Sequence, residues 1–299
     1  MKSIICIVLT FLFFSKNIFA QDDLLKMLQD ESTAKHEPVL AMFKTNKLIN
    51  INTNETVRKR NLDVRISHLF GNIGKESGGG VHNLYGIDQS ADIRIGFHYG
   101  VTDHLMVGVA RAKRNEDLEG LVKYRIFDQT TDNGIPVSVS AFANMAYSVK
   151  ETADFKNNNY RFVYSSQLIL ARKFSSRLSI VVIPTFIHRN FVGADDDNNT
   201  WSLSGGFRFK FTPSASIIAD YSHTLGRENL VLPRYDVIGA GVEIETGGHV
   251  FTLMFSNASG ILENDYLVNT FDSWEKGGYK LSFNISRMFK IGKESEAVK

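Results

Sequence analysis

Charged side chains stand two residues apart in several stretches of this sequence, as in Asp63 and Arg65 or Asp92 and Arg94. In an extended chain, positions two apart point to the same side. Acidic and basic groups would then gather along one wall, where they could set the electric field of a water-filled passage. The set with this spacing is Asp63, Arg65, Asp92, Arg94, Glu119, Lys123, Arg125, Arg161, Arg208, Lys210, Asp220 and Glu243.

Basic residues outnumber acidic ones in this set, seven to five, so a passage that they line would be slightly cationic. We predict a weak preference for anions, with the field shaped by the arginines at 65, 94, 125, 161 and 208. The alternative is an interior filled by salt bridges among these groups, which would hold the wall in shape and conduct nothing. The sequence leaves both open, because the lumen that it predicts is narrow.

The elements that would carry these groups are strands with one apolar and one polar face. In the last segment, Leu281 and Phe283 alternate with Ser282 and Asn284. Alternation with period two indicates a strand whose faces meet different solvents, and about 9–11 residues suit a tilted strand that crosses a bilayer. The predicted strands are 62–70, 91–99, 105–111, 118–127, 137–147, 160–172, 178–188, 201–211, 215–222, 235–244, 250–256 and 279–289.

The connectors between these segments are sorted by length. Short turns at 101–103, 175–176, 212–213 and 246–248 alternate with long polar stretches at 71–90, 149–159, 190–200, 223–234 and 257–278. One connector on the side of the short turns, 128–136, is somewhat long. We therefore predict an all-β fold, a transmembrane antiparallel up-and-down β-barrel of about 12 strands with short periplasmic turns and long outer loops. A soluble β-sandwich is the alternative, but it has no reason to sort its loops in this way.

Four regions are predicted along the chain. Residues 1–20 have the pattern of a signal peptide, with Lys2 ahead of an apolar core and Ala20 at the cleavage site. Residues 21–60 are expected to form a periplasmic lead-in that could fold into the lumen as a plug. The barrel is predicted at 61–290, followed by a polar tail at 291–299.

Composition and motifs argue against several classes of protein. The formal net charge is +2 and falls to zero without Lys2 and Lys16, so a nucleic-acid partner is not expected. Cys6, the single cysteine, lies in the predicted signal peptide, which leaves the mature chain without disulfides. The sequence has no metal-binding motif and no complete nucleotide fingerprint, so neither a metal nor another cofactor is predicted.

A lipid-modifying barrel enzyme is the catalytic alternative. His68 and His188 are predicted on the lipid-facing side near the outer strand ends, where such an enzyme would hold its base. Counting from the turn at 175–176 places Ser166 out of reach of His188, and no Gly-x-Ser-x-Gly motif occurs. We therefore predict no enzymatic activity.

Several stretches resemble a family of bacterial outer-membrane β-barrel proteins of unknown function. They are NLYGIDQ at 83–89, GVTDHL at 100–105, ARKFSSRL at 171–178, PTFIHRN at 184–190, ETGGHVF at 245–251 and FNISR at 283–287. The resemblance extends from about residue 38 to the last strand. It implies the barrel fold and the membrane location, and it brings no reaction or ligand.

The expected protein is thus a passive pore or small-solute transport barrel in the outer membrane of a Gram-negative bacterium. A non-conducting barrel that serves structure or surface docking is the alternative. Its expected partners are outer-membrane lipid and lipopolysaccharide, together with the barrel-assembly machinery during biogenesis. The small solute is left unidentified by the sequence.

Overall fold

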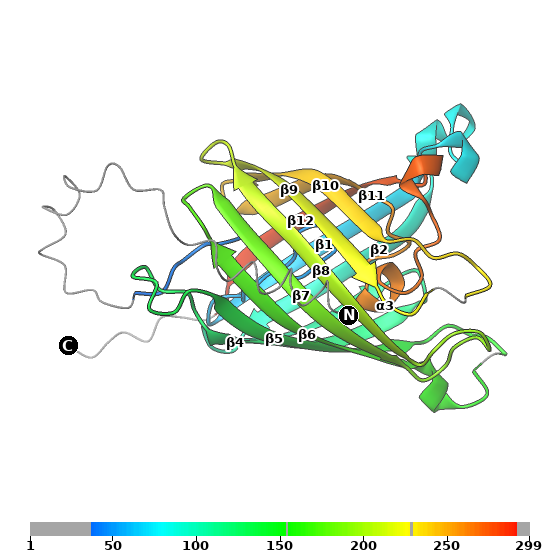
Figure 1. Cartoon of the computed structure of the whole chain (residues 1–299), viewed down its shortest axis with the longest axis horizontal. Coiled ribbons are helices and arrows are strands. Elements are labelled where there is room, and N and C mark those ends of the chain that lie inside the picture. The colour runs from blue at the N-terminus through cyan, green and yellow to red at the C-terminus, as the bar shows by residue number, and fades with distance from the viewer. Residues whose placement is uncertain (1–36, 154, 228–229, 292–299) are drawn as a thin grey trace, which may run out of the picture.

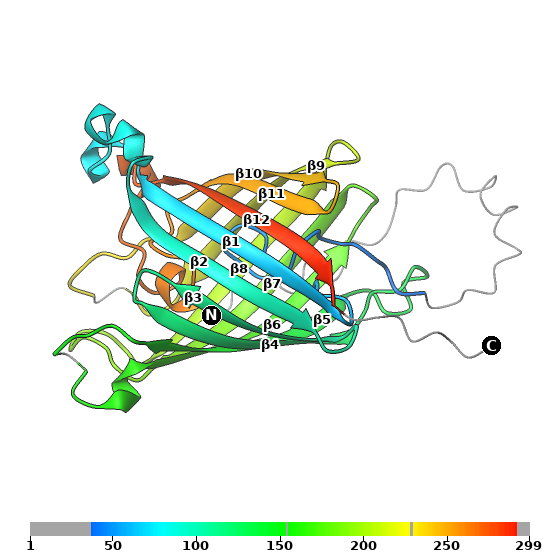
Figure 2. The ribbon, with the colours of Figure 1, turned by 180° about the vertical axis from the view of Figure 1, so that it is seen from behind.

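Twelve antiparallel strands close into one barrel in the computed structural model, which describes residues 37–153, 155–227 and 230–291. Each strand pairs with its neighbours in sequence, and β1 pairs with β12 to close the wall (Figures 1 and 2). This confirms the predicted fold class. The strands are β1 (Asn61–Asn72), β2 (Ser90–Gly100), β3 (Leu105–Ala112), β4 (Asp117–Phe127), β5 (Ser138–Ser148), β6 (Phe162–Lys173), β7 (Leu178–Arg189), β8 (Asn199–Lys210), β9 (Ala215–Thr224), β10 (Val237–Thr246), β11 (His249–Ser256) and β12 (Lys280–Lys290).

Alternation of side chains produces the two faces of the wall. In β12, Ser282 and Asn284 are buried inside the barrel, whereas Leu281 and Phe283 face outward. Polar groups thereby reach the interior while apolar groups cover the exterior, as a bilayer requires. The predicted signal peptide lies outside the described residues, as does the polar tail beyond Ile291.

The two ends of the barrel differ. One end, which we call the turn end, carries the short connections 101–104, 174–177, 211–214 and 247–248, and also the longer 128–137. The other, the loop end, carries 73–89, 149–161, 190–198, 225–236 and 257–279, with one short connection at 113–116. Its loops contain the short helices η1 (Lys75–Ser77), η2 (Val81–Gly86), η3 (Asn158–Arg161), α3 (Glu263–Tyr266) and η4 (Trp274–Lys276). Among the described residues, no helix is both long and apolar enough to cross a membrane.

Residues 40–58, here called the internal segment, run from the turn end into the barrel and back (blue in Figure 1). Backbone bridges fix its two ends, Pro38 to Thr130 and Lys59 to Gly100. Inside, the chain reverses in a tight hairpin, in which Leu48 N donates to Ile51 O over 2.8 Å. The predicted lead-in region therefore includes a stretch that occupies the lumen.

Apolar packing fixes this hairpin to one side of the wall. Leu48 and Ile51 are buried in the same cluster as the inward-facing Ile169, Ile183 and Ile218. Strands β6, β7 and β9 are therefore apolar on both faces along part of their length. Burial of an aliphatic side chain contributes roughly 1.5–3 kcal/mol, so this contact is a large part of what holds the segment.

Glycine makes room for the hairpin on the inward face of β8. A Cβ at Gly206 would lie 2.7 Å from Leu48 Cδ2 and 2.9 Å from Ile51 Cδ1. The adjacent Gly205 faces outward, and a Cβ there would meet only Val181 O, at 3.8 Å. Only the first of these neighbouring glycines is therefore required by the internal segment.

We expect Gly206→Val to displace the internal segment at a cost of about 1–3 kcal/mol, because it overfills a packed interface. The barrel should still form, and cleavage by trypsin after Lys47 should become faster. Gly205→Val is the control and should leave the cleavage rate of the native chain unchanged. Equal rates for the two variants would contradict the packing described above.

Candidate functional site

The tip of the internal segment is bound by one carboxylate of the wall. Asp220 Oδ2 accepts the backbone N–H of Asn50 at 2.7 Å and that of Ile51 at 3.2 Å. Its Oδ1 accepts Asn50 Nδ2 at 2.8 Å. A buried carboxylate that accepts several N–H donors is well compensated for its loss of water. Asp220, one of the predicted lumen charges, thus holds the hairpin at mid-barrel.

Two predicted cations hold the flanks of the hairpin. Lys123 Nζ donates to the carbonyl oxygens of Asn46 and Thr53, both at 2.9 Å, and lies 3.4 Å from Glu55 O. Arg65 donates to Asn46 Oδ1 at 2.7 Å and to Thr45 Oγ1 at 2.9 Å. Both cations are buried, and their donors are directed to the segment rather than to open water.

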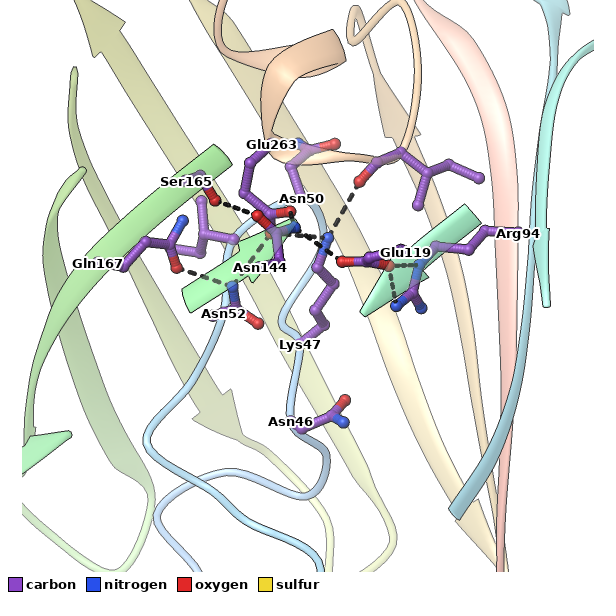
Figure 3. A network of polar contacts seen from close by, with 12 residues as sticks. Asn46, Lys47, Asn50, Asn52, Arg94, Glu119, Asn144, Ser165, Gln167 and Glu263 are labelled. Atoms are coloured by element: carbon purple, nitrogen blue, oxygen red, sulfur yellow. Dashed lines mark hydrogen bonds and ion pairs between the residues drawn. The ribbon is translucent and has the colours of Figure 1, made fainter. Parts of the chain in front are cut away.

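The connection 257–279 enters the barrel from the loop end and contacts the internal segment there. Glu263, on α3, accepts Asn144 Nδ2 at 2.8 Å and Asn52 Nδ2 at 3.1 Å, and its Oε1 lies 3.3 Å from Lys47 Nζ. Asn52 Nδ2 also donates to Gln167 Oε1 at 2.7 Å. Figure 3 shows the internal segment approaching from one side and α3 from the other, with Glu263 between them. The connection 257–279 and the internal segment thus meet inside the barrel.

Other predicted lumen charges pair with groups on the wall itself. Arg94 and Glu119 form an ion pair of 2.6 Å, and Arg208 and Glu243 form one of 2.7 Å. Asp63 Oδ2 lies 3.4 Å from His98 Nδ1 on the neighbouring strand. These pairs agree with the alternative of a salt-bridged interior that the sequence left open.

The remaining predicted charges lie toward the ends of the barrel. Asp92 accepts backbone N–H groups of Arg114 and Ile261, both at 2.9 Å, and so joins two connections of the loop end. Arg125 pairs with Asp128 at 2.9 Å near the turn end, and Lys210 is half-buried at the end of β8.

The structure corrects the predicted position of Arg161. It was expected on an inward-facing strand position, but it belongs to η3 in the connection between β5 and β6. Its guanidinium donates to Ser148 O at 3.0 Å and to Lys150 O at 2.7 Å, and it lies over the Phe155 ring. The strand begins only at Phe162, since residues 158–161 form a 3-10 turn. Arg161 therefore braces a loop rather than lining the lumen.

Little space remains between the internal segment and the wall. Two interior spaces lined by described residues measure ≈ 20 and ≈ 10 Å³, room for about one water each. A larger cavity of ≈ 650 Å³ lies at the turn end, where the segment enters. In this conformation, the middle of the barrel is filled.

The sequence pattern missed the residues that do the filling. Asn50, Asn52 and Lys47 lie in a region predicted without detail, and Glu263 lies in a predicted outer loop. One signal was present in β7, whose residues 180–183 are all apolar. An uninterrupted apolar run indicates a strand buried on both faces, and thus an interior that is packed rather than wet.

The possible catalytic pair is not assembled. His188 Nδ1 lies 2.7 Å from Asn199 Oδ1, and the register places Ser166 opposite Phe186 rather than opposite the histidine. Within the described ranges, no three His, Cys, Asp or Glu side chains come together as a metal site.

One carboxylic acid in the connection 257–279, which folds into the barrel, is buried with an unpartnered oxygen. Asp265, on α3, accepts Asn115 Nδ2 at 2.7 Å, while its Oδ2 has no hydrogen-bond partner. Burial raises the pKa of the Asp265 carboxyl well above its usual range, and the nearby Asp117 and Asp92 raise it further. The neutral acid is therefore favoured where the connection is docked.

These features define a membrane β-barrel of twelve strands whose lumen is occupied by its own chain. The model of the family "Membrane bound beta barrel domain (DUF5777)" matches residues 43–289, and the chain belongs to this family. That match confirms the resemblance found in the sequence, and it includes most of the internal segment. No curated protein matches the chain.

Solved structures with a similar barrel share little sequence with this chain. A structure of the NanC porin is 10% identical with a TM-score of 0.49, covering 77% of this chain and 100% of the porin. The KdgM porin in complex with disordered oligogalacturonate is 8% identical with a TM-score of 0.46, covering 78% and 99%. Omp33 of Acinetobacter baumannii is 12% identical with a TM-score of 0.39, covering 77% and 99%.

We expect Lys123→Met to loosen the internal segment by about 1–3 kcal/mol, because it leaves buried carbonyl oxygens without a donor. Hydrogen–deuterium exchange of the amides at 46–53 measures the effect. Lys210→Met, at the turn end, should not alter exchange there. Unchanged protection in the Lys123 variant would show that apolar packing alone retains the segment.

Asp265→Asn should stabilise the docked connection at neutral pH. The pKa of Asp265 is higher in the folded state than in the unfolded state. Its contribution to the free energy of unfolding is therefore fully present at a pH below the pKa of the unfolded state, and it is lost as the pH rises through the pKa of the folded state. Asparagine copies the neutral acid, so the advantage of the variant in unfolding free energy should grow from pH 4 to pH 8. Parallel pH profiles of the two proteins would contradict this assignment.

Proposed function

We propose that this chain is an outer-membrane transport barrel that its internal segment holds closed, and that solutes pass only when the segment leaves the lumen. The observation that carries the proposal is the binding of the hairpin by Asp220, Lys123 and Arg65. These contacts combine side chains of the wall with backbone and side-chain groups of the segment. They can be broken without opening the wall.

The attachment of the segment favours movement over a permanent structural role. Among the described residues, no ladder joins residues 40–58 to a barrel strand, and the isolated bridges lie at or beyond its two ends or within its own hairpin. Hydrogen bonds to charged groups such as these contribute about 1.5–3 kcal/mol each, and no ladder of the wall has to break when they are lost. Removal of the segment therefore costs far less than removal of a strand.

Departure of the segment would also change the electrostatics of the lumen. Arg65 and Lys123 would lose the oxygen acceptors that now surround them and would face water. Arg94 and Arg208 would keep their carboxylate partners. The predicted preference for anions thus belongs to an open state, and the two basic residues on β1 and β4 would carry most of it.

In this proposal the turn end faces the periplasm and the loop end faces the exterior, which follows the usual arrangement of short turns and long loops. Lipid and lipopolysaccharide would contact the outer face, and the barrel-assembly machinery would insert the chain. The signal peptide predicted at 1–20 would direct export. A non-conducting structural barrel is the rival function, and the contact of Glu263 with Lys47 and Asn52 is the observation that favours it.

Ion conductance across a planar bilayer separates these functions. The native barrel should show few or no openings, while a variant in which residues 41–57 are replaced by a short Gly-Ser linker should conduct steadily with anion preference. Adding Arg65→Ser and Lys123→Ser to that variant should shift its reversal potential in a salt gradient toward zero. A folded deletion variant that stays silent would refute the proposal that the internal segment closes a transport barrel, and would favour the structural role.

A further inference from the structure

A groove of ≈ 710 Å³ crosses the outer face of the barrel from β4 to β8. Its floor is made of small or short side chains, Ala141, Ala143, Ser166 and Pro184. Larger side chains form its rim: Val122, Tyr124, Leu168, Phe186 and Trp201. Because these positions belong to the outward face of the strands, the groove is continuous with the surface that meets lipid.

The wall is weakened beneath this groove. The ladder between β6 and β7 pairs Gln167 with Thr185 and Leu170 with Val182, but the two positions between them are unpaired. Pro184 falls in this gap and has no N–H to donate, whereas it keeps its place opposite Leu203 on the other side. Proline within a sheet removes a ladder hydrogen bond, so this seam is easier to separate than its neighbours.

The inner side of the seam is apolar as well. Ile169 and Ile183 face inward there and pack with Phe142 and with Leu48 of the internal segment. Lys123 Nζ lies 5.8 Å from the centre of the Phe142 ring, at the border of this apolar wall. If the segment leaves, the lumen presents a cation next to an apolar surface, and behind that surface are the seam and the groove.

We infer that the cargo of this barrel is an alkyl carboxylate, a fatty-acid anion, whose chain moves between the lumen and the bilayer through the β6–β7 seam. The inference rests on the proposed function and names its substrate class. Lys123, with Arg65 beside the same segment, would hold the carboxylate, and the wall around Ile169 and Ile183 would hold the alkyl chain. A hydrophilic solute would gain nothing from that apolar wall, whereas an alkyl chain gains about 0.8 kcal/mol for each CH₂ that it buries.

Occupation of the groove can be measured with one tryptophan. The chain has 2 tryptophans, so Trp274→Phe leaves Trp201 at the rim as the single tryptophan, which can be excited selectively at the red edge of the absorption band. Dibromostearate added to this variant in micelles should quench Trp201 in a saturable way. Ala143→Phe, which fills the floor, should weaken the apparent affinity at least fivefold, and Ala240→Phe, on the lipid-facing side of β10, should not. Non-saturable quenching, or equal effects of the two substitutions, would overturn the groove as an alkyl site.

Passage through the seam can be tested by locking it. Ser165 and Ile187 are partners across β6 and β7, and both face inward, so a disulfide between Ser165→Cys and Ile187→Cys closes the seam without altering the groove. Met254→Cys with Ser282→Cys is the matched lock across β11 and β12. Both pairs are introduced into the barrel with the 41–57 replacement, in liposomes, and transfer of a fluorescent stearate analogue from the medium into the bilayer is followed.

The seam lock should reduce transfer at least tenfold, reduction of the disulfide should restore it, and the control lock should have no effect. Ion conductance of the same proteins, measured in parallel, should be equal for both locks. Normal conductance with equal transfer in both locked proteins would overturn the lateral path and leave the transport barrel intact. Absence of conductance in every variant with the replacement would instead overturn the proposed function, together with the substrate that rests on it.

Discussion

Charged groups inside the barrel are shielded from water, and an ion removed from water is costly unless other groups solvate it. Asp220, Lys123 and Arg65 meet this requirement through contacts with the internal segment. The segment in turn has backbone groups that no sheet satisfies, and these three side chains satisfy several of them. Wall and segment thus depend on one another. This exchange of hydrogen bonds, together with the apolar packing of Leu48 and Ile51, keeps the lumen filled.

The same arrangement explains why one side of the barrel departs from the usual polar interior. Leu48 and Ile51 need an apolar surface, and Ile169, Ile183 and Ile218 provide it. The surface has a second consequence, because it lies behind the seam that Pro184 weakens and the groove that small side chains form outside. A barrel with apolar side chains on both faces of its wall is better suited to an amphiphile than to a hydrophilic solute. The proposed closure and the proposed substrate class therefore depend on the same few strands.

The sequence predicted most of the barrel because its signals are local. In β12, the alternation of Leu281, Ser282, Phe283 and Asn284 decides the two faces with no knowledge of the neighbouring strands. Arg161 shows where such reasoning fails, since a 3-10 turn next to a strand interrupts the alternation without an obvious change in composition. The candidate site was predicted as a set of inward charges, and eleven of these twelve residues lie in strands of the barrel wall. Their partners could not be named, because Lys47 and Glu263 are separated by 216 positions and meet only in the closed barrel.

By itself the sequence determined the class of fold, the number of strands, the difference between the two ends and the side of the wall on which most of the predicted charges lie. These properties depend on periods of two residues and on the lengths of connections, which the chain carries locally. Only the tertiary structure decided that the lumen is filled, that Asp220 binds the tip of a hairpin, and that a groove lies outside the weakened seam. The reason is physical: closure of the barrel brings together side chains from distant segments, and their packing and hydrogen bonds exist only after closure.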